Sequence, residues 1–403
     1  MEFGPIWRSM LRNKGGYILI AVQIAVTMTI MVNAIAIIQE RSANIARPSG
    51  LDEANTFALA SVSFVPDIDK KGLIDEDLDL LRKLPGVHSV TSSNSFPLRQ
   101  GGWSEGLSLE PGEGTSDSSS AIYFVDEHGV ETFDLNLIEG ENFTANQVNW
   151  VNRETNDWPA VAIVTQALAE DLFQDETGSY LGKTFYVNDD NPVNIIGVVE
   201  TLQAPWASWT GVERSMLVPQ RRDSEFVRYI IRTEPGYRDE LMPQVEELLA
   251  KSNPDRIIRS LVTMEEVRKL AYVGEAGMIS ILTFVVALLT AITGLGIVGL
   301  ASFNVSRRTR QIGIRRALGA TRTAIIRHFM VENFVVSTVG VIAGGILAVA
   351  LNIFMVETFS LEPLNWYVIP IAMITLWIVG QLAVAGPARK ASNVTPAIAT
   401  RSI

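Results

Sequence analysis

Residues 307–321 read RRTRQIGIRRALGAT, and this stretch decides how the rest of the chain is interpreted. It holds five arginines and no acid, and it lies between two long apolar runs. Arginine beside a membrane span is typical of the cytoplasmic side. Apolar residues recur among the arginines with helical spacing, which is a pattern suited to holding a soluble partner. The stretch therefore predicts both an orientation in a membrane and a functional surface.

Four apolar stretches are long enough to cross a bilayer, which requires about 20 residues. They are residues 17–38, 277–303, 329–356 and 366–386. The first is interpreted as a retained anchor, because no small-residue cleavage site follows it promptly. The expected fold class is a membrane protein with four transmembrane α-helices in a 1+3 arrangement. A large α+β extracytoplasmic domain, residues 39–276, is inserted between the first and the second helix.

The charges are sorted along the chain in a way that supports this topology. Residues 39–276 contain 40 acids and 20 bases, although the whole chain has a net charge of only −11. The other 13 bases fall before the first span, within residues 304–328, and after the last span. Four crossings place these three segments on one side, so both termini and the 304–328 loop are expected to be cytoplasmic. Residues 357–365 then form an outer turn and residues 387–403 a cytoplasmic tail.

The region outside the membrane has the mixed pattern of small α+β subdomains. Helices are predicted at 73–84, 166–173 and 240–251, and strands at 87–91, 161–164, 184–187, 193–199 and 226–232. The first and last parts are expected to share one subdomain with stalk ends, and the middle part, about 125–210, to be inserted. Residues 1–16 are predicted to form an interfacial amphipathic helix, with a charged extension of the first span as the alternative.

Several kinds of chemistry are excluded or disfavoured. The chain has no cysteine, which rules out disulfides, zinc–cysteine sites and thiol nucleophiles. Three residues separate the two glycines of residues 178–184, whereas a phosphate-binding loop needs four between its glycines. We therefore expect no ATP hydrolysis, no cofactor and no metal in this chain, and no nucleic acid as a partner. The acidic run 75–79 is interpreted as a solvated helix start, in preference to a calcium loop.

Small and polar residues in the spans predict helix packing. The small residues with this role are Gly294, Gly296, Gly299, Gly340 and Gly344. Whether they pack within one chain or between two is left open. The polar residues of the first span are expected to face other helices; they are Gln23, Thr27, Thr29 and Asn33. In the outer domain, five tryptophans (103, 150, 158, 206 and 209) are interpreted as core residues or as a contact surface.

The basic stretch itself is expected to form a helix over residues 311–318 that ends at Gly319. Its simplest role would be to set topology and bind anionic lipid. The apolar positions among the arginines favour docking of a protein partner instead, since lipid binding needs only charge. The candidate docking residues are Arg308, Arg310, Gln311, Ile312, Gly313, Ile314, Arg315, Arg316, Ala317, Leu318 and Gly319.

Residues 307–332 closely resemble the cytoplasmic loop and third-span entry of MacB/FtsX-type ABC transporter permeases, which follow R-x-R-E-I-G-I-R-R-A-L-G-A and then I-x-x-Q-F-L-x-E. Thirteen positions match, ending at Glu332. The chain departs from this pattern at two positions, where Gln311 replaces the usual glutamate and His328 the usual glutamine. Residues 159–173, 181–185 and 195–199 look like the MacB-type periplasmic core domain.

The resemblance implies a dimer of identical or paralogous permeases in the bacterial inner membrane, each bound to a cytoplasmic ABC ATPase. ATP and Mg would be held by that separate ATPase subunit, because no fused ATPase domain is expected. The basic stretch would act as the coupling helix. A periplasmic adaptor and an outer-membrane channel are further candidate partners.

The function expected from the resemblance is that of a non-catalytic permease subunit in a mechanotransmission-type transporter. It would drive efflux or release of a peptide, lipid-linked or amphiphilic substrate at the outer face. The alternative is an FtsX-like regulator that activates a cell-wall hydrolase. An ATPase-independent receptor or membrane enzyme is the third hypothesis.

Overall fold

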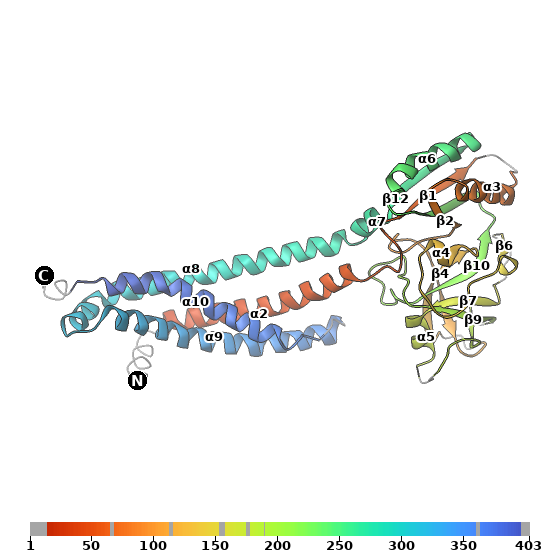
Figure 1. Ribbon diagram of the computed structural model, residues 1–403. Helices are drawn as coiled ribbons and strands as arrows, with labels where there is room; N and C mark the ends of the chain where they lie inside the picture. Colours follow the sequence, from red (N-terminus) through yellow and green to blue (C-terminus); the bar gives the residue numbers. More distant parts are fainter. Residues whose placement is uncertain are drawn as a thin grey trace. The chain divides into compact units, whose positions relative to one another are not determined.

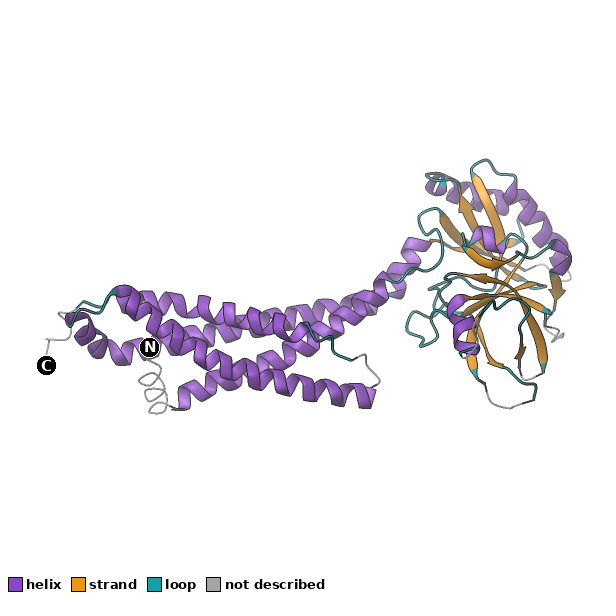
Figure 2. Cartoon of the chain, turned by 60° about the horizontal axis from the view of Figure 1, so that its bottom comes forward, coloured by secondary structure: helices purple, strands orange, loops and turns teal. Residues whose placement is uncertain are grey.

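A computed structural model describes residues 14–64, 68–112, 116–152, 158–174, 178–188, 190–359 and 363–395. The chain forms two compact units, one running from Ala46 to Gly274 and the other comprising the segments before and after it. Figures 1 and 2 show that one unit is built of long helices and the other of strands with short helices. Most of the expected interfacial helix 1–16 and the end of the tail 387–403 lie outside the described residues.

The helical unit contains four helices that are long and apolar enough to cross a membrane. They are α2 (Lys14–Ala46), α8 (Val273–Ala317), α9 (Arg322–Phe359) and α10 (Val368–Ser392). The 45 residues of α8 make a rod about 67 Å long at 1.5 Å per residue. This length is about twice the thickness of the hydrocarbon core, so α8 extends well beyond the bilayer.

The prediction of a separate loop at residues 304–328 is wrong in one respect, because α8 continues through Ala317 without a break. The chain turns only at residues 318–321, and α9 begins at Arg322. Arginine, leucine and alanine favour helix, and no proline interrupts the segment. The helix expected at residues 311–318 is therefore, up to Ala317, the last part of α8.

Polar side chains of α2 bind the two neighbouring helices, as the sequence predicts. Such bonds satisfy polar groups that lipid cannot. They run from Gln23 Nε2 to the Ile292 carbonyl (3.1 Å), between the hydroxyls of Thr27 and Thr293 (2.8 Å), from Thr29 Oγ1 to the Gly344 carbonyl (3.2 Å) and from Asn33 Nδ2 to the Ala348 carbonyl (3.3 Å). Helix α2 is thus packed among α8 and α9.

The five small residues of the spans do not share one surface. A Cβ atom added at Gly340 would lie 2.8 Å from Ile24 Cβ, and one at Gly344 would lie 2.6 Å from the Ala25 carbonyl oxygen, so both glycines allow α9 to approach α2. Gly296 lies against the side chain of Gln23, also on α2. A Cβ at Gly294 would make an ordinary 3.7 Å contact with Val379 of α10, while at Gly299 no atom of the described chain lies within 4 Å.

The other unit contains a four-stranded antiparallel sheet in the order β12-β1-β11-β2. Its strands are β1 (Thr56–Ser63), β2 (Val87–Ser92), β11 (Phe226–Thr233) and β12 (Arg256–Thr263). Helices α3 (Lys70–Arg82) and α6 (Arg238–Ser252) contribute leucines to a shared core with this sheet. Helix α7 (Met264–Ala271) follows β12. The first and last parts of the unit therefore share a subdomain, as expected.

The inserted subdomain is a small barrel. Strand pairing runs β4-β3-β8-β9-β7-β10, and a parallel pairing of β4 with β10 closes the ring. The six strands are β3 (Trp103–Ser108), β4 (Ser118–Val125), β7 (Val161–Thr165), β8 (Thr184–Val187), β9 (Asn191–Val199) and β10 (Ser215–Arg222). The remaining elements are α4 (Gly129–Thr132), β5 (Leu137–Gly140), η1 (Ala145–Gln147), β6 (Asn149–Val151) and α5 (Gln166–Leu172). Closure leaves no free edge among the six strands.

The inserted part is wider than the expected 125–210, because β3, β4 and β10 all belong to the barrel. The composition of residues 112–120, rich in glycine, serine and acids, predicts a loop, yet the serines at 118–120 begin β4, and Ser120 is fully buried. Strand formation depends on packing against neighbours more than on intrinsic preference. The predicted strands 87–91, 161–164, 184–187, 193–199 and 226–232 are confirmed as parts of β2, β7, β8, β9 and β11.

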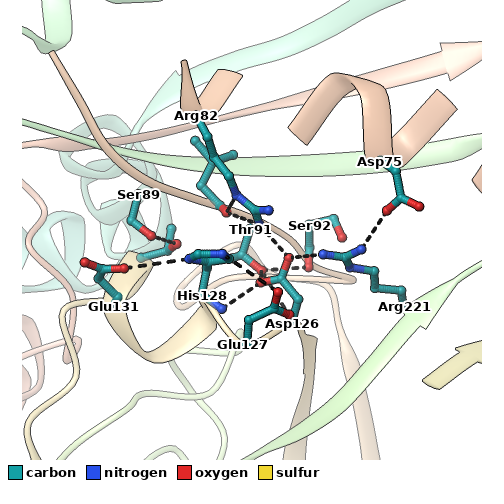
Figure 3. A network of polar contacts seen from close by, with 12 residues as sticks. Asp75, Arg82, Ser89, Thr91, Ser92, Asp126, Glu127, His128, Glu131 and Arg221 are labelled. Atoms are coloured by element: carbon teal, nitrogen blue, oxygen red, sulfur yellow. Dashed lines mark hydrogen bonds and ion pairs between the residues drawn. The ribbon is translucent and has the colours of Figure 1, made fainter. Parts of the chain in front are cut away.

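A buried carboxylate joins the two subdomains, as Figure 3 shows. Asp126 follows β4 directly and is completely buried. It accepts hydrogen bonds from Arg82 of α3 (2.8 Å), Thr91 of β2 (2.7 Å) and Arg221 of β10 (2.7 Å). Arg221 also pairs with Asp75 at 2.7 Å. The network therefore ties the sheet and its helix α3 to the barrel.

The acidic run at residues 75–79 is not simply a solvated helix start. Asp77 is 1% exposed and pairs with Arg256 at 2.6 Å, and it accepts a 2.6 Å hydrogen bond from Tyr229. The helical period places Asp77 on the same buried face as Ile74 and Leu81. Burial and the neighbouring Asp77 carboxylate raise the pKa of the Tyr229 hydroxyl well above its usual value.

The five tryptophans do not form one cluster. Trp206 and Trp209 contact each other edge to face with ring centroids 5.8 Å apart. Trp150 packs against the core of the four-stranded sheet, and Trp158 packs against the barrel core. Trp103 is 39% exposed and lies beside the guanidinium of Arg222. The five tryptophans therefore lie in separate places, and Trp150 and Trp158 pack against the two cores.

Candidate functional site

The basic segment ends in a well-formed helix cap. Gly319 has φ of +97°, a conformation that side chains disfavour. The Gly319 amide donates to the Arg316 carbonyl (3.2 Å), and the Ala320 amide donates to the Arg315 carbonyl (3.0 Å). These two bonds are the Schellman pattern that closes a helix end, so the sequence prediction of a cap at Gly319 is confirmed. The corner between α8 and α9 is thus held by the backbone.

The eleven candidate docking residues separate into three groups by exposure. Ile312 and Gly313 are buried in the helical unit, while Arg308 and Arg316 are half-buried. The exposed residues are Arg310, Gln311, Ile314, Arg315, Ala317, Leu318 and Gly319. Leu318 is 83% exposed and Ile314 is 45% exposed. The corner therefore presents two large apolar side chains between exposed arginines.

Arg308 faces the interior of the helical unit. Its Nη1 lies 3.0 Å from Glu332 Oε1 on α9, and its Nη2 donates to the Tyr17 hydroxyl of α2 at 3.3 Å. The Tyr17 hydroxyl in turn donates to Glu332 at 2.6 Å, and it accepts a further hydrogen bond from Asn304 Nδ2 at 3.3 Å. Glu332 is 3% exposed. These four side chains join α2, α8 and α9 just before the corner, so Arg308 positions the corner.

Only part of this arrangement could be predicted from the sequence. Glu332 could be singled out because it is an acid at the boundary of an apolar span. Nothing in the sequence predicted a role for Tyr17 or Asn304, because tyrosine and asparagine are both common near the ends of spans. Their roles follow from the meeting of three helices that are distant in the chain.

A cavity of about 540 Å³ lies between the end of α8 and the start of α9. Its walls include Arg308, Gln311 and Arg315 from α8 and His328 and Phe329 from α9. Gln311 and His328 are the two positions at which the chain departs from the family pattern, and both line this one cavity. The histidine ring also packs edge to face against Phe329, with centroids 5.9 Å apart. The two departures thus belong to a single local environment.

Four spanning helices, a large extracytoplasmic α/β domain between the first and second, and a basic corner define a multi-pass membrane permease. The chain matches the model of the MacB-like periplasmic core domain over residues 18–248 and that of the FtsX-like permease C-terminal domain over residues 272–396. It belongs to the MacB/FtsX-type family of ABC transporter permeases.

Related proteins of known name agree with this assignment. The chain is 25% identical over 338 residues to the uncharacterized ABC transporter permease YknZ of Bacillus subtilis, with 81% of this chain and 78% of YknZ covered. It is 21% identical over 416 residues to the macrolide export ATP-binding/permease protein MacB of Photorhabdus laumondii, covering 97% of this chain and 59% of that MacB. A MacB of Campylobacter jejuni is 36% identical over 121 residues, which are 29% of this chain and 19% of that protein. The chain thus spans about half the length of several MacB relatives that it matches.

Solved structures include similar domains. The periplasmic region of MacB from Actinobacillus actinomycetemcomitans aligns with a TM-score of 0.35 and 18% identity, over 54% of this chain and 94% of that domain. The extracellular domain of YknZ aligns with a TM-score of 0.32 and 16% identity, over 50% of this chain and all of that domain.

Proposed function

We propose that this chain is the permease subunit of a mechanotransmission-type ABC transporter. It couples ATP hydrolysis by a separate cytoplasmic ATPase to efflux or release of a peptide, lipid-linked or amphiphilic substrate at the outer face of the inner membrane. The observation that carries the proposal is the exposed corner, where Ile314 and Leu318 are exposed in the same segment as the exposed arginines Arg310 and Arg315. Exposed apolar residues ringed by charges are typical of a protein interface.

Rigidity around the corner supports a mechanical role. The backbone cap at Gly319 fixes the turn, and Arg308 with Glu332 joins α8 to α9 directly behind it. From this corner α8 continues unbroken to Val273, which follows α7 by one residue. A displacement of the corner is therefore transmitted along a stiff rod rather than absorbed in a loop.

The direction and the partners of the transport cycle complete the proposal. Several relatives are named for macrolide export, and one for pyoverdine export, which supports outward movement of the substrate. Both termini and the corner lie in the cytoplasm, ATP and Mg are bound by the ATPase, and two permease chains form the working unit. A periplasmic adaptor with an outer-membrane channel is the proposed route onward.

The test is ATPase stimulation in a reconstituted complex of the full-length chain and its ATPase. Leu318→Asp places a charge where a partner's apolar surface would pack, and we expect stimulation to fall about tenfold or more because an anchor residue of an interface is lost. Lys390→Asp is the control for a change of charge, since Lys390 is an exposed residue of α10 and is not part of the turn between α8 and α9.

Co-purification of the ATPase with each variant separates binding from signalling. Loss of both association and stimulation in Leu318→Asp, with Lys390→Asp behaving as wild type, is the expected pattern. Full stimulation by Leu318→Asp would show that the corner does not contact the ATPase.

A further inference from the structure

A second cavity lies in the other unit, where the chain crosses between the sheet and the barrel. The crossings are residues 93–102, between β2 and β3, and residues 223–225, between β10 and β11. The cavity has a volume of about 300 Å³, which is at the lower end of the range for small-molecule sites. Arg99, Arg222 and Arg228 line it, together with Trp103 and Phe226. No aspartate or glutamate of the described chain is among its lining residues.

Arg228 is the most unusual of these residues because it is only 7% exposed. Its Nη1 donates to the carbonyl of Asn94, and its guanidinium stacks over the ring of Phe226 at 4.7 Å. Burial, together with the positive charge of Arg99 nearby, lowers the pKa of Arg228 to about 10. Within the described residues, no carboxylate pairs with either Arg228 or Arg99. A buried charge is costly without a counter-charge.

Two other arginines of this unit with little exposure show how unusual that arrangement is. Arg256 pairs with Asp77, and Arg221 pairs with both Asp126 and Asp75 (Figure 3). Arg221 also lines the cavity, but its charge is already matched. A guanidinium has five N–H donors, and a neutral amide could supply the single bond to the Asn94 carbonyl. Arg228 and Arg99 therefore carry charge beyond what the fold requires.

The walls of the cavity also offer apolar surface. The guanidinium of Arg222 lies over the rings of Trp103 (4.7 Å) and Phe124 (4.8 Å). Trp103 and Phe226 are 39% and 38% exposed. Arg99, Phe226 and Arg228 are shared with an adjoining cavity of about 380 Å³, which adds the exposed Arg259 and again has no acid among its described lining residues. Together the two cavities form a basic, partly aromatic cleft in a domain that is otherwise strongly acidic.

We infer that this cleft is a binding site for an anionic group, a carboxylate or a phosphate, carried on an apolar or aromatic body. The guanidinium fork of arginine matches both anions, and charge-assisted bonds of this kind are stronger than neutral ones. The exposed rings would receive the apolar part. A bound anion would contact both subdomains, since Arg228 belongs to the sheet and Arg222 to the barrel. Taking this ligand to be the transported substrate rests on the proposed function; the binding itself does not.

The experiment uses the full-length chain in detergent, without ATPase, and fluorine NMR of small probes. The probes are 4-(trifluoromethyl)benzoate and 4-(trifluoromethyl)phenyl phosphate, and their relative affinities tell a carboxylate site from a phosphate site. The neutral 4-(trifluoromethyl)benzamide controls for partition into micelles and for purely apolar binding. We expect saturable binding of at least one anion and none of the amide.

Three variants locate the site. Arg228→Met and Arg99→Gln each remove one charge-assisted partner and are expected to weaken anion binding about tenfold. Arg99 is exposed, so its replacement does not threaten folding even if Arg228→Met does. Arg232→Met, on the same strand β11, is the control because Arg232 pairs with Asp134 and lies outside both cavities.

Any of three results would overturn the inference. The first is equal affinity of wild type and Arg99→Gln for the anions. The second is the absence of saturable anion binding to the wild-type chain, and the third is amide binding as tight as that of the anions. Each of these outcomes is independent of ATPase stimulation, so failure of the anion site and failure of the corner are separate results.

Discussion

At the scale of single residues, the molecule buries charge in two different ways. Asp77 and Arg256 are each 1% exposed at their side chains and neutralise each other, and Tyr229 donates a further hydrogen bond to Asp77. Such a pair is weak evidence for stability as a whole, because desolvation offsets much of the attraction. Removal of one partner is nevertheless costly, since the other is then left as a buried charge. Arg228 lacks such a carboxylate among the described residues, and this is why its environment suggests a ligand.

Replacement of Asp77 tests the buried pair. We expect Asp77→Ala to lower the free energy of unfolding by about 3–5 kcal/mol, because Arg256 loses its counter-charge in a dry environment. Asp79→Ala, two residues along α3 and exposed, should change it by about 0.5 kcal/mol or less. Thermal unfolding of both variants in the same detergent measures the difference. Equal losses in the two variants would mean that the pair has no special role.

Asp171 of α5 gives a pH-dependent prediction for the barrel. Partial burial opposes ionisation of this carboxylate, but hydrogen bonds from Ser118 (2.5 Å) and Arg214 (2.6 Å) outweigh it and lower the pKa of Asp171 below its usual 3.8. A lowered carboxylate pKa stabilises the fold above the usual value, and the benefit is lost as the pH falls through the folded-state pKa. We therefore expect Asp171→Asn to be less stable than wild type at pH 7 and to approach it near pH 3. Thermal midpoints across this range measure the gap, and a gap that persists unchanged at pH 3 would contradict the assignment.

At the scale of whole elements, the contact between α2 and α9 depends on the absence of side chains. Gly340 and Gly344 lie one turn apart on α9, and the backbone of α2 lies directly against them. Without a hydrophobic force between helices in lipid, such close approach is a main source of association. The polar side chains of α2 then reach carbonyls that a wider spacing would put out of range. Packing and hydrogen bonding between these helices therefore depend on each other.

Two adjacent glycines of α9 give a matched test of this contact. A Cβ at Gly344 would come within 2.6 Å of both the Ala25 carbonyl oxygen and Met28 Cβ, whereas one at Gly345 would meet Ile369 at an ordinary 3.8 Å. We expect Gly344→Ala to destabilise the helical unit by about 1–3 kcal/mol through overpacking. Gly345→Ala should be neutral or stabilising by up to about 1 kcal/mol, since alanine favours helix. The thermal midpoints of the two variants in detergent should therefore move in opposite directions or differ clearly, and identical midpoints would refute the packing argument.

At the scale of the whole molecule, the parts predictable from sequence are those governed by local pattern. The length of the apolar stretches identified four spans, and short runs rich in valine and isoleucine identified strands such as β7 and β9. Closure of the barrel could not be read in this way, because β4 pairs with β10, about ninety residues further along the chain. The same limit applies to the candidate sites. The arginines of residues 307–316 form a visible cluster, whereas Arg99 and Arg228 meet only because the chain crosses twice between the sheet and the barrel.

The orientation of the chain in the membrane is testable by cysteine labelling, because the sequence has no cysteine of its own to react. Single cysteines at Glu76→Cys on α3 and Leu318→Cys at the corner would be the only thiols in the chain, and both positions are exposed. The excess of arginine beside the corner predicts that the corner is cytoplasmic and that the acidic domain lies on the opposite side of the membrane. We therefore expect a membrane-impermeant maleimide to label the cysteine of Glu76→Cys in intact spheroplasts and that of Leu318→Cys only after permeabilisation. Labelling of both variants in intact cells, or the reverse pattern, would place the corner outside and remove the basis for contact with a cytoplasmic ATPase.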